Sequence, residues 1–319
     1  MPEPSAQELE LITIGRVGVD LYPEQIGVPL AKVKTFAKSL GGSPTNVAVA
    51  AARLGHRTAV ITKVGDDGFG LYVREALAEF GVDARFVGTD PDHRTPVVFC
   101  EIFPPDSFPL LFYRSPKAPD LNITADELDL AAIERVPILW TTGTALTEEP
   151  SRSATYAAMR AARGRTIHDL DHRHHLWPSN AVARDAAKEA LRHAKVAVGN
   201  IDEVEMATGE RDPDAAAEAI LALGPTLAIV KQGPRGTLAR TKAERVEVPA
   251  VRIEVVNGLG AGDAFGGALV HGLLRGWPLR RTLEFANAAG AIVASRLACA
   301  DAMPTEAEVD ALLSRPAHV

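Results

Sequence analysis

The chain has 319 residues, 46% of them hydrophobic, and a formal net charge of −7 at pH 7. This length and composition suit one domain with a large buried core. The acidic balance argues against a protein that binds nucleic acid, because such proteins normally carry a clustered basic surface.

The N-terminal segment and the cysteines indicate where the protein works. Residues 1–10 are polar and acidic and do not resemble a signal peptide, and no apolar run reaches membrane-spanning length. The two cysteines, Cys100 and Cys299, lie in apolar stretches and are expected to be reduced and buried. We therefore predict a cytoplasmic protein with no contact to a membrane.

Short apolar segments alternate with helical patterns along most of the chain. The predicted strands are residues 11–15, 58–64, 138–142, 166–170, 196–199 and 226–231. Helical patterns between them include residues 69–80, 151–163 and 180–193, and capping-box spacings at Thr124-x-x-Glu127 and Thr305-x-x-Glu308 support two further helix starts. This alternation predicts an α/β fold with a mainly parallel central sheet and helices on both faces.

Two regions interrupt the alternation. Residues 16–39 separate the first strand from the first helix, and residues 95–117 hold two extended runs around a proline-rich turn. Strands without partner helices need another sheet to cover them. We predict that these two segments form a small β lid over the active site of a single domain spanning residues 1–319.

A glycine pair opens the first helical pattern, in the segment Leu40-Gly-Gly-Ser-Pro-Thr-Asn46. Gly41 and Gly42 permit the backbone to approach a ligand closely. Ser43 or Thr45 is expected to cap a helix that begins near Asn46.

A second glycine motif follows a predicted strand at residues 253–256 and precedes another helix. Its glycines 258, 260 and 262 can turn backbone N–H groups toward an anion at the positive end of the helix. Asp263 then stands in the first turn, where its carboxylate could accept a proton from an attacking hydroxyl. Such turns also occur in dinucleotide sites, so spacing alone leaves the ligand open. No Walker-type motif occurs in the chain.

Together the two motifs resemble the paired signatures of the ribokinase, or PfkB, family of carbohydrate kinases, over residues 11–304. The resemblance implies a ribokinase-like three-layer sandwich, ATP and Mg²⁺ as cofactors, and a homodimer formed through the lid. It makes Asp263 the catalytic base and the amides of Gly260, Ala261 and Gly262 the anion hole. Within the family, residues 15–22, 40–46, 108–114 and 299–304 are similar to the kinases of 5-dehydro-2-deoxygluconate in myo-inositol breakdown.

The resemblance also implies which residues form the sugar site. The positions that contact the substrate in the family correspond to Asp20, Gly42 and Asn46. Arg114 and Arg173 are expected to bind the carboxylate of a sugar acid, because an arginine fork binds a carboxylate bidentately. Arg173 lies in a loop that resembles the Asp-x-Asn-x-Arg-x-x-Leu-Trp pattern of sugar-acid kinases. This chain has Asp171 where those kinases commonly have Asn. The sequence leaves open which arginine binds this carboxylate: Arg114, Arg173, Arg16 or a combination of them.

On the nucleotide side, the resemblance implies a further set of contacts: Asn200, Glu203, Lys231, Gly233, Gly236 and Asn287. Glu203 is expected near Mg²⁺, acting through water, since Mg²⁺ prefers oxygen ligands and keeps several waters. Many relatives have Asp-Thr-x before Gly-Ala-Gly, and that aspartate helps to hold a monovalent cation. This chain has Asn257-Gly258-Leu259, which leaves its need for potassium open.

Two other classes of function compete with this interpretation. Within the same chemistry, the acceptor could be 2-dehydro-3-deoxygluconate, fructose or a nucleoside. A non-catalytic sugar sensor would keep the fold without turnover, although the intact Gly-Ala-Gly-Asp argues against it. A nicotinamide-dependent oxidoreductase is disfavoured because the chain lacks an N-terminal G-x-G-x-x-G.

Overall fold

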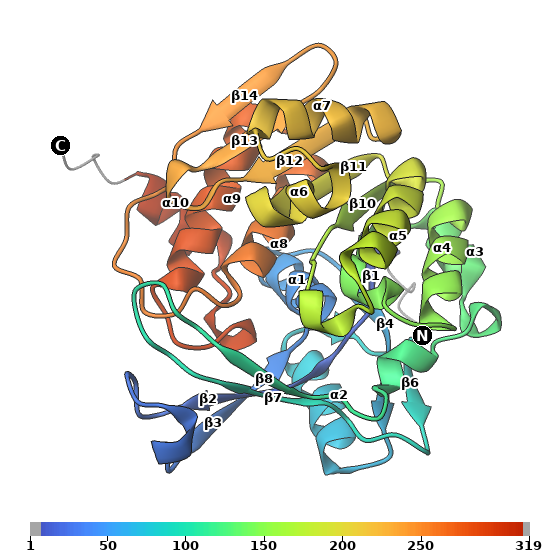
Figure 1. Cartoon of the computed structure of the whole chain (residues 1–319), viewed down its shortest axis with the longest axis vertical. Helices are drawn as coiled ribbons and strands as arrows, with labels where there is room; N and C mark the ends of the chain where they lie inside the picture. The colour runs from blue at the N-terminus through green and yellow to red at the C-terminus, as the bar shows by residue number, and fades with distance from the viewer. Residues whose placement is uncertain (1–7, 315–319) are drawn as a thin grey trace, which may run out of the picture.

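The computed structural model describes residues 8–314, and a ten-stranded sheet runs through its centre (Figure 1). The strand order is β14-β13-β12-β11-β10-β9-β1-β4-β5, with β6 also beside β4. The parallel strands are β1 (Leu11–Ile14), β4 (Thr58–Gly65), β5 (Val82–Asp83), β6 (Val87–Asp90), β9 (Ile138–Thr142), β10 (Arg165–Asp169), β11 (Val196–Asn200) and β12 (Leu227–Lys231). Only β13 (Thr237–Arg240) and β14 (Arg245–Val248) are antiparallel. The predicted mainly parallel sheet is confirmed.

Helices cover both faces of this sheet. One face packs against α1 (Ser43–Arg53), α2 (Gly68–Glu79), α8 (Ala261–Leu274), α9 (Leu279–Ala294) and α10 (Glu306–Leu313). The other packs against α3 (Leu130–Arg135), α4 (Ser151–Ala161), α5 (Asn180–His193), α6 (Ile201–Thr208) and α7 (Pro213–Leu223). Successive strand residues alternate between the two cores: Ile229 belongs to the first and Val230 to the second. This is the predicted three-layer sandwich.

A separate four-stranded sheet lies beside the sandwich, in the lower part of Figure 1. Its order is β3 (Phe36–Gly41), β2 (Gly18–Pro23), β7 (Val97–Cys100) and β8 (Leu110–Tyr113). These strands come from the two segments that interrupt the βα alternation, so the prediction of a second small sheet is confirmed. Single 3₁₀ turns complete the described chain: η1 (Leu30–Lys32), η2 (Pro119–Asn122), η3 (Ala125–Glu127), η4 (Gly143–Leu146), η5 (His174–Leu176), η6 (Gly233–Arg235) and η7 (Ala300–Ala302).

Three local predictions are wrong. Residues 253–256 form no strand, because the amides of Val256 and Asn257 donate to the carbonyl of Ala294 at the end of α9 and make no ladder. Helix α1 begins at Ser43, three residues earlier than expected, with Gly42 as its N-cap and no side-chain cap. The Thr124 capping box is present but begins only the 3₁₀ turn η3.

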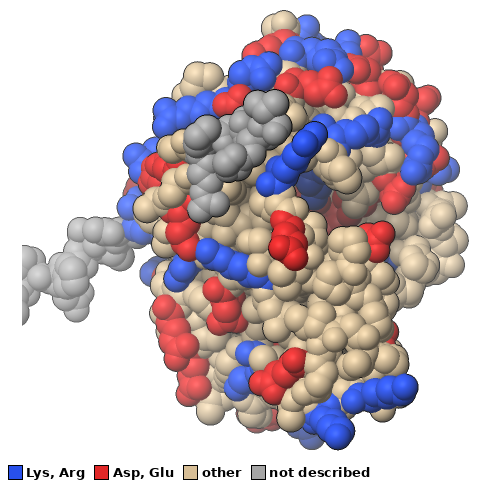
Figure 2. Space-filling view, turned by 90° about the vertical axis from the view of Figure 1, so that its left-hand side faces the viewer, with Lys and Arg blue, Asp and Glu red and all other residues tan. Residues whose placement is uncertain are grey.

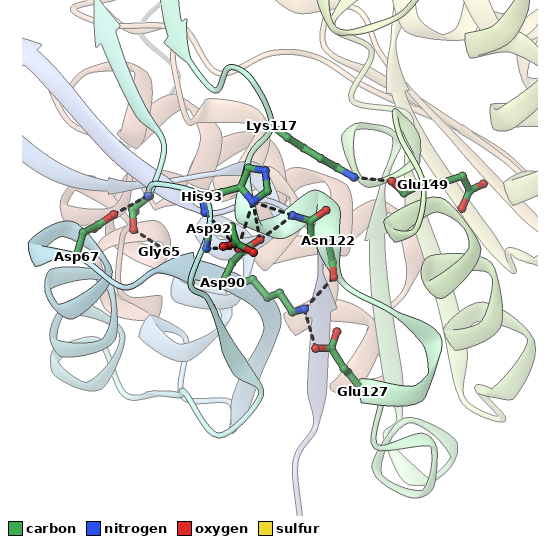
Figure 3. A network of polar contacts seen from close by, with 11 residues as sticks. Gly65, Asp67, Asp90, Asp92, His93, Lys117, Asn122, Glu127 and Glu149 are labelled. Carbon is green, nitrogen blue, oxygen red and sulfur yellow. Dashed lines mark hydrogen bonds and ion pairs between the residues drawn. The ribbon is translucent and has the colours of Figure 1, made fainter.

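A polar network fixes the base of the second sheet, where the chain enters β7 and where it returns from β8 (Figure 3). Asp90 at the end of β6 accepts a hydrogen bond from the Asn122 amide at 2.6 Å and lies 3.1 Å from Nδ1 of His93. The Gly65 amide donates to Thr95 Oγ1 at 2.9 Å. The entering and returning segments are therefore tied to each other and to β4.

The surface carries charges of both signs. On the face drawn in Figure 2, lysine and arginine side chains lie among aspartate and glutamate side chains, and an uncharged area occupies much of the lower half. Among residues 8–314, no helix combines the length and the hydropathy that a membrane span requires.

His168 makes the stability of the fold depend on pH. Its side chain is fully buried in β10, Thr141 Oγ1 lies 2.9 Å from its Nδ1, and its Nε2 has no partner among the described residues. Burial lowers the pKa of His168 to about 4. Since the folded pKa lies below that of the unfolded chain, the unfolded chain takes up the proton first, and stability is lost as pH falls below the unfolded value.

We expect the wild type to lose roughly 2 kcal/mol of unfolding free energy from this group between pH 7 and pH 5. His168→Asn removes the titrating group and should flatten the pH dependence by that amount, as measured by urea unfolding at pH 7, 6 and 5. His174→Asn, at an exposed position, is the control and should leave the dependence unchanged. Equal pH dependence in the wild type and His168→Asn would contradict the assignment.

Candidate active site

The carboxyl ends of the parallel strands bring the predicted polar residues to one edge of the sheet. Arg16 lies just beyond β1, Asp171 and Arg173 just beyond β10, Asn200 ends β11 and Lys231 ends β12. In open parallel sheets ligands bind outside this edge. The predicted polar residues therefore lie at the edge of the sheet where ligands bind in folds of this kind.

Asp263 stands where the N-termini of α1 and α8 meet. Its Oδ1 accepts a hydrogen bond from Ser43 Oγ and its Oδ2 accepts one from Asn46 Nδ2, both at 2.8 Å. Burial raises the pKa of Asp263, while these two hydrogen bonds act in the opposite direction. The result is an oriented carboxylate with more than ordinary affinity for a proton.

Two glycines make this close approach possible. Gly42 has φ +103°, and a Cβ there would lie 2.4 Å from the carbonyl oxygen of Arg16. Gly260, the N-cap of α8, has φ +80°, and a Cβ there would lie 2.6 Å from Sγ of Cys299. No side chain of the described residues caps α8. The amides of its first turn, Ala261 and Gly262 included, are therefore available to an anion.

A small cavity joins Asp263 to the second sheet. Predicted residues that line it are Asp20, Gly42, Asn46, Arg173, Gly260 and Asp263. Asp20 lies over Gly41, where a Cβ would come within 2.2 Å of the carboxylate. Burial raises the pKa of Asp20 to about 6 against the opposing charge of Arg16. Tyr22 Oη lies 3.3 Å from Asp20 Oδ2 and donates to Cys299 Sγ at 2.7 Å.

Two arginines converge on Asp171 at the border of this cavity. Arg16 Nε lies 3.7 Å and Arg173 Nη2 lies 3.1 Å from its carboxylate, which also accepts a hydrogen bond from Thr144 at 2.8 Å. Burial would raise the pKa of Asp171, but the two arginines outweigh it and hold the pKa below its usual range. The buried Nε of each arginine has no hydrogen-bond partner among the described residues. The two guanidinium groups exceed the charge of Asp171 alone, and the carboxyl groups of Asp20 and Asp263 line the same cavity.

Arg114 lies away from the cavity beside Asp263. Its Nη2 donates to Asp120 Oδ2 at 2.8 Å, both side chains are buried, and Arg114 does not line the cavity. Of the three arginines that the sequence left open, the structure brings Arg16 and Arg173 to the site. The signal for Arg16 was its position directly after the first strand.

A second, open cavity of about 550 Å³ lies next to this edge, and Asn200, Lys231 and Gly233 line it. Three residues predicted for the nucleotide side, Glu203, Gly236 and Asn287, do not line it. Gly236 has φ +99° and passes so close to β14 that a Cβ would lie 2.0 Å from the carbonyl oxygen of Val248. Asn287 accepts from Thr237 Oγ1 at 2.7 Å and donates to backbone carbonyls after β14, so it ties α9 to the sheet edge.

Asn200 and Glu203 form a capping box at the start of α6. Glu203 Oε2 accepts from the Asn200 amide at 2.7 Å, and Asn200 Oδ1 accepts from the Glu203 amide at 3.0 Å. The other Glu203 oxygen makes no hydrogen bond within residues 8–314. Burial raises the pKa of neighbouring Asp169 to about 7, although Lys231 opposes the shift. Sequence reasoning missed Asp169, which ends β10 two residues before Asp171.

These two carboxylates fit a magnesium ion. No group of three or more histidine, cysteine, aspartate or glutamate side chains among the described residues could enclose a metal. Mg²⁺ commonly binds through one or two carboxylates, with water and substrate phosphate completing its shell. Asp169 and Glu203 could supply this partial set.

A monovalent cation does not fit the position where relatives carry an aspartate. Asn257 is fully buried, its Nδ2 donates to the carbonyl of Leu297, and its Oδ1 accepts from the Leu259 amide at 3.0 Å. The side-chain amide of Asn257 thus uses the Leu297 carbonyl as its hydrogen-bond acceptor, and it adds no negative charge that would attract a cation. The side chain of Asn257 instead uses its hydrogen bonds to hold residues 258–262, which we call the glycine loop.

Gly260→Ala tests the geometry of the glycine loop. The new methyl group would displace Cys299 or the loop, so we expect kcat to fall roughly 10–100-fold, as misplacement of catalytic groups does. Gly81→Ala is a matched control, because Gly81 has φ +75° with nothing within 4 Å of a Cβ. Both variants should lose roughly 1 kcal/mol of stability through the left-handed backbone. Equal kcat values in the two variants would show that the contact between residue 260 and Cys299 does not matter.

Comparison with known proteins identifies the family. Residues 9–306 match the pfkB family carbohydrate kinases. A relative from Geobacillus kaustophilus named 5-dehydro-2-deoxygluconokinase is 32% identical, over 99% of this chain and 96% of that protein. A protein of the same name from Photobacterium profundum is 36% identical, over 93% and 92%.

Solved structures agree. An E. coli structure titled as a Ribokinase II with ATP and Mg²⁺ superposes with a TM-score of 0.87 at 25% identity, covering 97% of this chain and 100% of that one. A fructokinase double mutant from Vibrio cholerae with fructose, ADP and potassium gives 0.85 at 26% identity, covering 96% and 99%. The resemblance that the two glycine motifs predict is confirmed, and the chain belongs to the pfkB family of carbohydrate kinases.

Proposed function

We propose that this kinase transfers the γ-phosphoryl group of ATP to the terminal hydroxyl of 5-dehydro-2-deoxy-D-gluconate, in myo-inositol breakdown. The choice of a sugar acid rests on the pair Arg16 and Arg173, whose buried Nε atoms have no hydrogen-bond partner among the described residues and lie beside the Asp263 cavity. A carboxylate would satisfy both guanidinium groups. Relatives named for this substrate support the same choice.

In the proposed reaction, Asp263 accepts the proton of the sugar hydroxyl as that oxygen bonds to the γ-phosphorus. The bond from the γ-phosphorus to the bridging oxygen breaks, and ADP leaves. The amides of Gly260, Ala261 and Gly262 stabilise charge on the phosphoryl oxygens. Mg²⁺ bound near Asp169 and Glu203 would offset phosphate charge. Asp20 and Asn46 would hold sugar hydroxyls by directional hydrogen bonds.

The second sheet would act as a lid and as a dimer interface. Val98, Leu110 and Phe112 line the Asp263 cavity, and their apolar side chains would keep water from the phosphoryl group. On the sheet, Phe36, Phe99 and Tyr113 form a chain of edge-to-face ring contacts at 5.4 and 5.5 Å, and Tyr113 is 61% exposed. An exposed aromatic surface of this kind favours cover by a second copy. Two unbridged buried cysteines accord with a cytoplasmic location.

ATP consumption across a panel of acceptors tests the substrate. We expect 5-dehydro-2-deoxygluconate to exceed 2-dehydro-3-deoxygluconate, fructose, ribose and adenosine in kcat/KM, without a requirement for potassium because Asn257 takes the place of the cation site. Asp263→Asn should lower kcat by roughly 10²–10⁴. Preference for another acceptor would keep the chemistry and overturn the substrate. Sugar-acid binding without turnover would favour the sensor.

A matched arginine series tests the carboxylate site. Arg16→Lys and Arg173→Lys lose the planar fork, so each should raise KM for the sugar acid roughly tenfold, since hydrogen bonds to charged groups contribute about 1.5–3 kcal/mol. Arg114→Lys can keep its pairing with Asp120 and should change KM less than about twofold. KM for fructose should change little in all three variants. The proposal fails if Arg114→Lys has the largest effect.

A further inference from the structure

Lys231 occupies an unusual place between the two cavities. It ends β12, lines the open cavity beside Asn200 and Gly233, and directs its side chain toward the start of α8. Its Nζ lies 3.4 Å from the point where a Cβ on Gly262 would stand. Gly262 immediately precedes Asp263. The ammonium group therefore lies between the open cavity and the Asp263 carboxylate.

The surroundings keep this amine charged. Burial alone would lower the pKa of Lys231, but Asp169, Glu203 and Asp263 together hold it above its usual value. Within residues 8–314 the ammonium group makes no hydrogen bond and no ion pair inside 4 Å. Lys231 is partly buried, and a lysine that served only to neutralise these acids would be expected in direct contact with one of them. Its three N–H donors are instead free to bind another anion.

A cation at this point meets the charge that phosphoryl transfer develops. The γ-phosphoryl group must pass between the open cavity and the hydroxyl activated by Asp263, and charge on its oxygens is shared with the amides of Ala261 and Gly262. The ammonium group lies against this same turn. In the resting enzyme the nearby carboxylates offset its charge, so its strongest interaction would arise as the phosphoryl group arrives.

We propose that Lys231 is a catalytic residue that binds the phosphoryl oxygens in the transition state, beyond any contact it makes with bound ATP. This inference rests on phosphoryl transfer, and the identity of the sugar does not enter it. It predicts an effect on kcat that exceeds the effect on ATP affinity. A residue that only neutralised the acidic cluster would change stability and ATP affinity together.

Lys231→Met should lower kcat roughly 10²–10³-fold, the usual loss for one donor to a developing oxyanion. The acceptor in this assay is the best one found for the wild type, so an error in the assigned sugar does not affect the result. The affinity for ATP with Mg²⁺, measured by calorimetry without sugar, should change less than about fivefold. Lys195→Met is the control, because exposed Lys195 lies just before β11 at the opposite edge of the sheet. It should retain wild-type kcat.

Two further measurements separate catalysis from folding. ADP with aluminium fluoride and Mg²⁺ mimics the transferring group, and its affinity relative to ADP alone should fall at least about tenfold in Lys231→Met. Lys231→Ala should regain part of its kcat when ethylammonium chloride is added, and tetramethylammonium chloride should have no effect. The proposal is overturned if ATP and the aluminium fluoride complex weaken by the same factor. It is also overturned if kcat falls less than about tenfold.

Discussion

The close packing of α1 against α8 is the constraint on which the rest of the site depends. A Cβ on Gly267 would lie 2.3 Å from Cβ of Ala50, and one on Gly266 would lie 3.0 Å from Cγ2 of Val47. Only glycines allow the two helix axes to come this near. Because the helices meet at their N-termini, Ser43 and Asn46 reach Asp263 with two hydrogen bonds of equal length. Packing in the core thus sets the orientation of the Asp263 carboxylate.

The second sheet is mechanically linked to the glycine loop. Tyr22 of β2 donates a hydrogen bond to Cys299, and the same sulfur contacts the Cα side of Gly260. Ser39 of β3 donates to Asp301 in η7. Movement of β2 and β3 would therefore reach the N-cap of α8 through the segment around Cys299. This gives a physical route by which a change at the second sheet can reach the first turn of α8.

Charge balance distinguishes the two sides of the site. Around the smaller cavity, Arg16 and Arg173 stand close to Asp171, and Asp20 and Asp263 line the same cavity. At the ends of β10 and β12, Asp169 and Glu203 accompany one cation, Lys231. Burial strengthens these interactions, because charges in a low-dielectric site interact more strongly than charges in water.

The sequence by itself determined the family, the layered fold, the two glycine turns and the candidate base, because these features are local in the chain. Apolar runs identified six strands of the central sheet but also suggested a strand at residues 253–256, which does not form. The 3.6-residue pattern identified helices such as 180–193, which the structure reproduces as Asn180–His193. Gly42 and Gly260 could be recognised because each supports a turn at its own position.

Only the tertiary structure decided between residues of the same chemical type. Arg114 and Arg16 look equivalent in sequence, yet Asp120 pairs with the first and the second lies in the cavity. Asn287 was expected on the nucleotide side, and only the structure shows that its hydrogen bonds to Thr237 and Pro249 hold α9 to the sheet edge. The approach of Lys231 to Gly262 spans 31 positions of the chain. Such contacts depend on how distant segments pack, which no local pattern encodes.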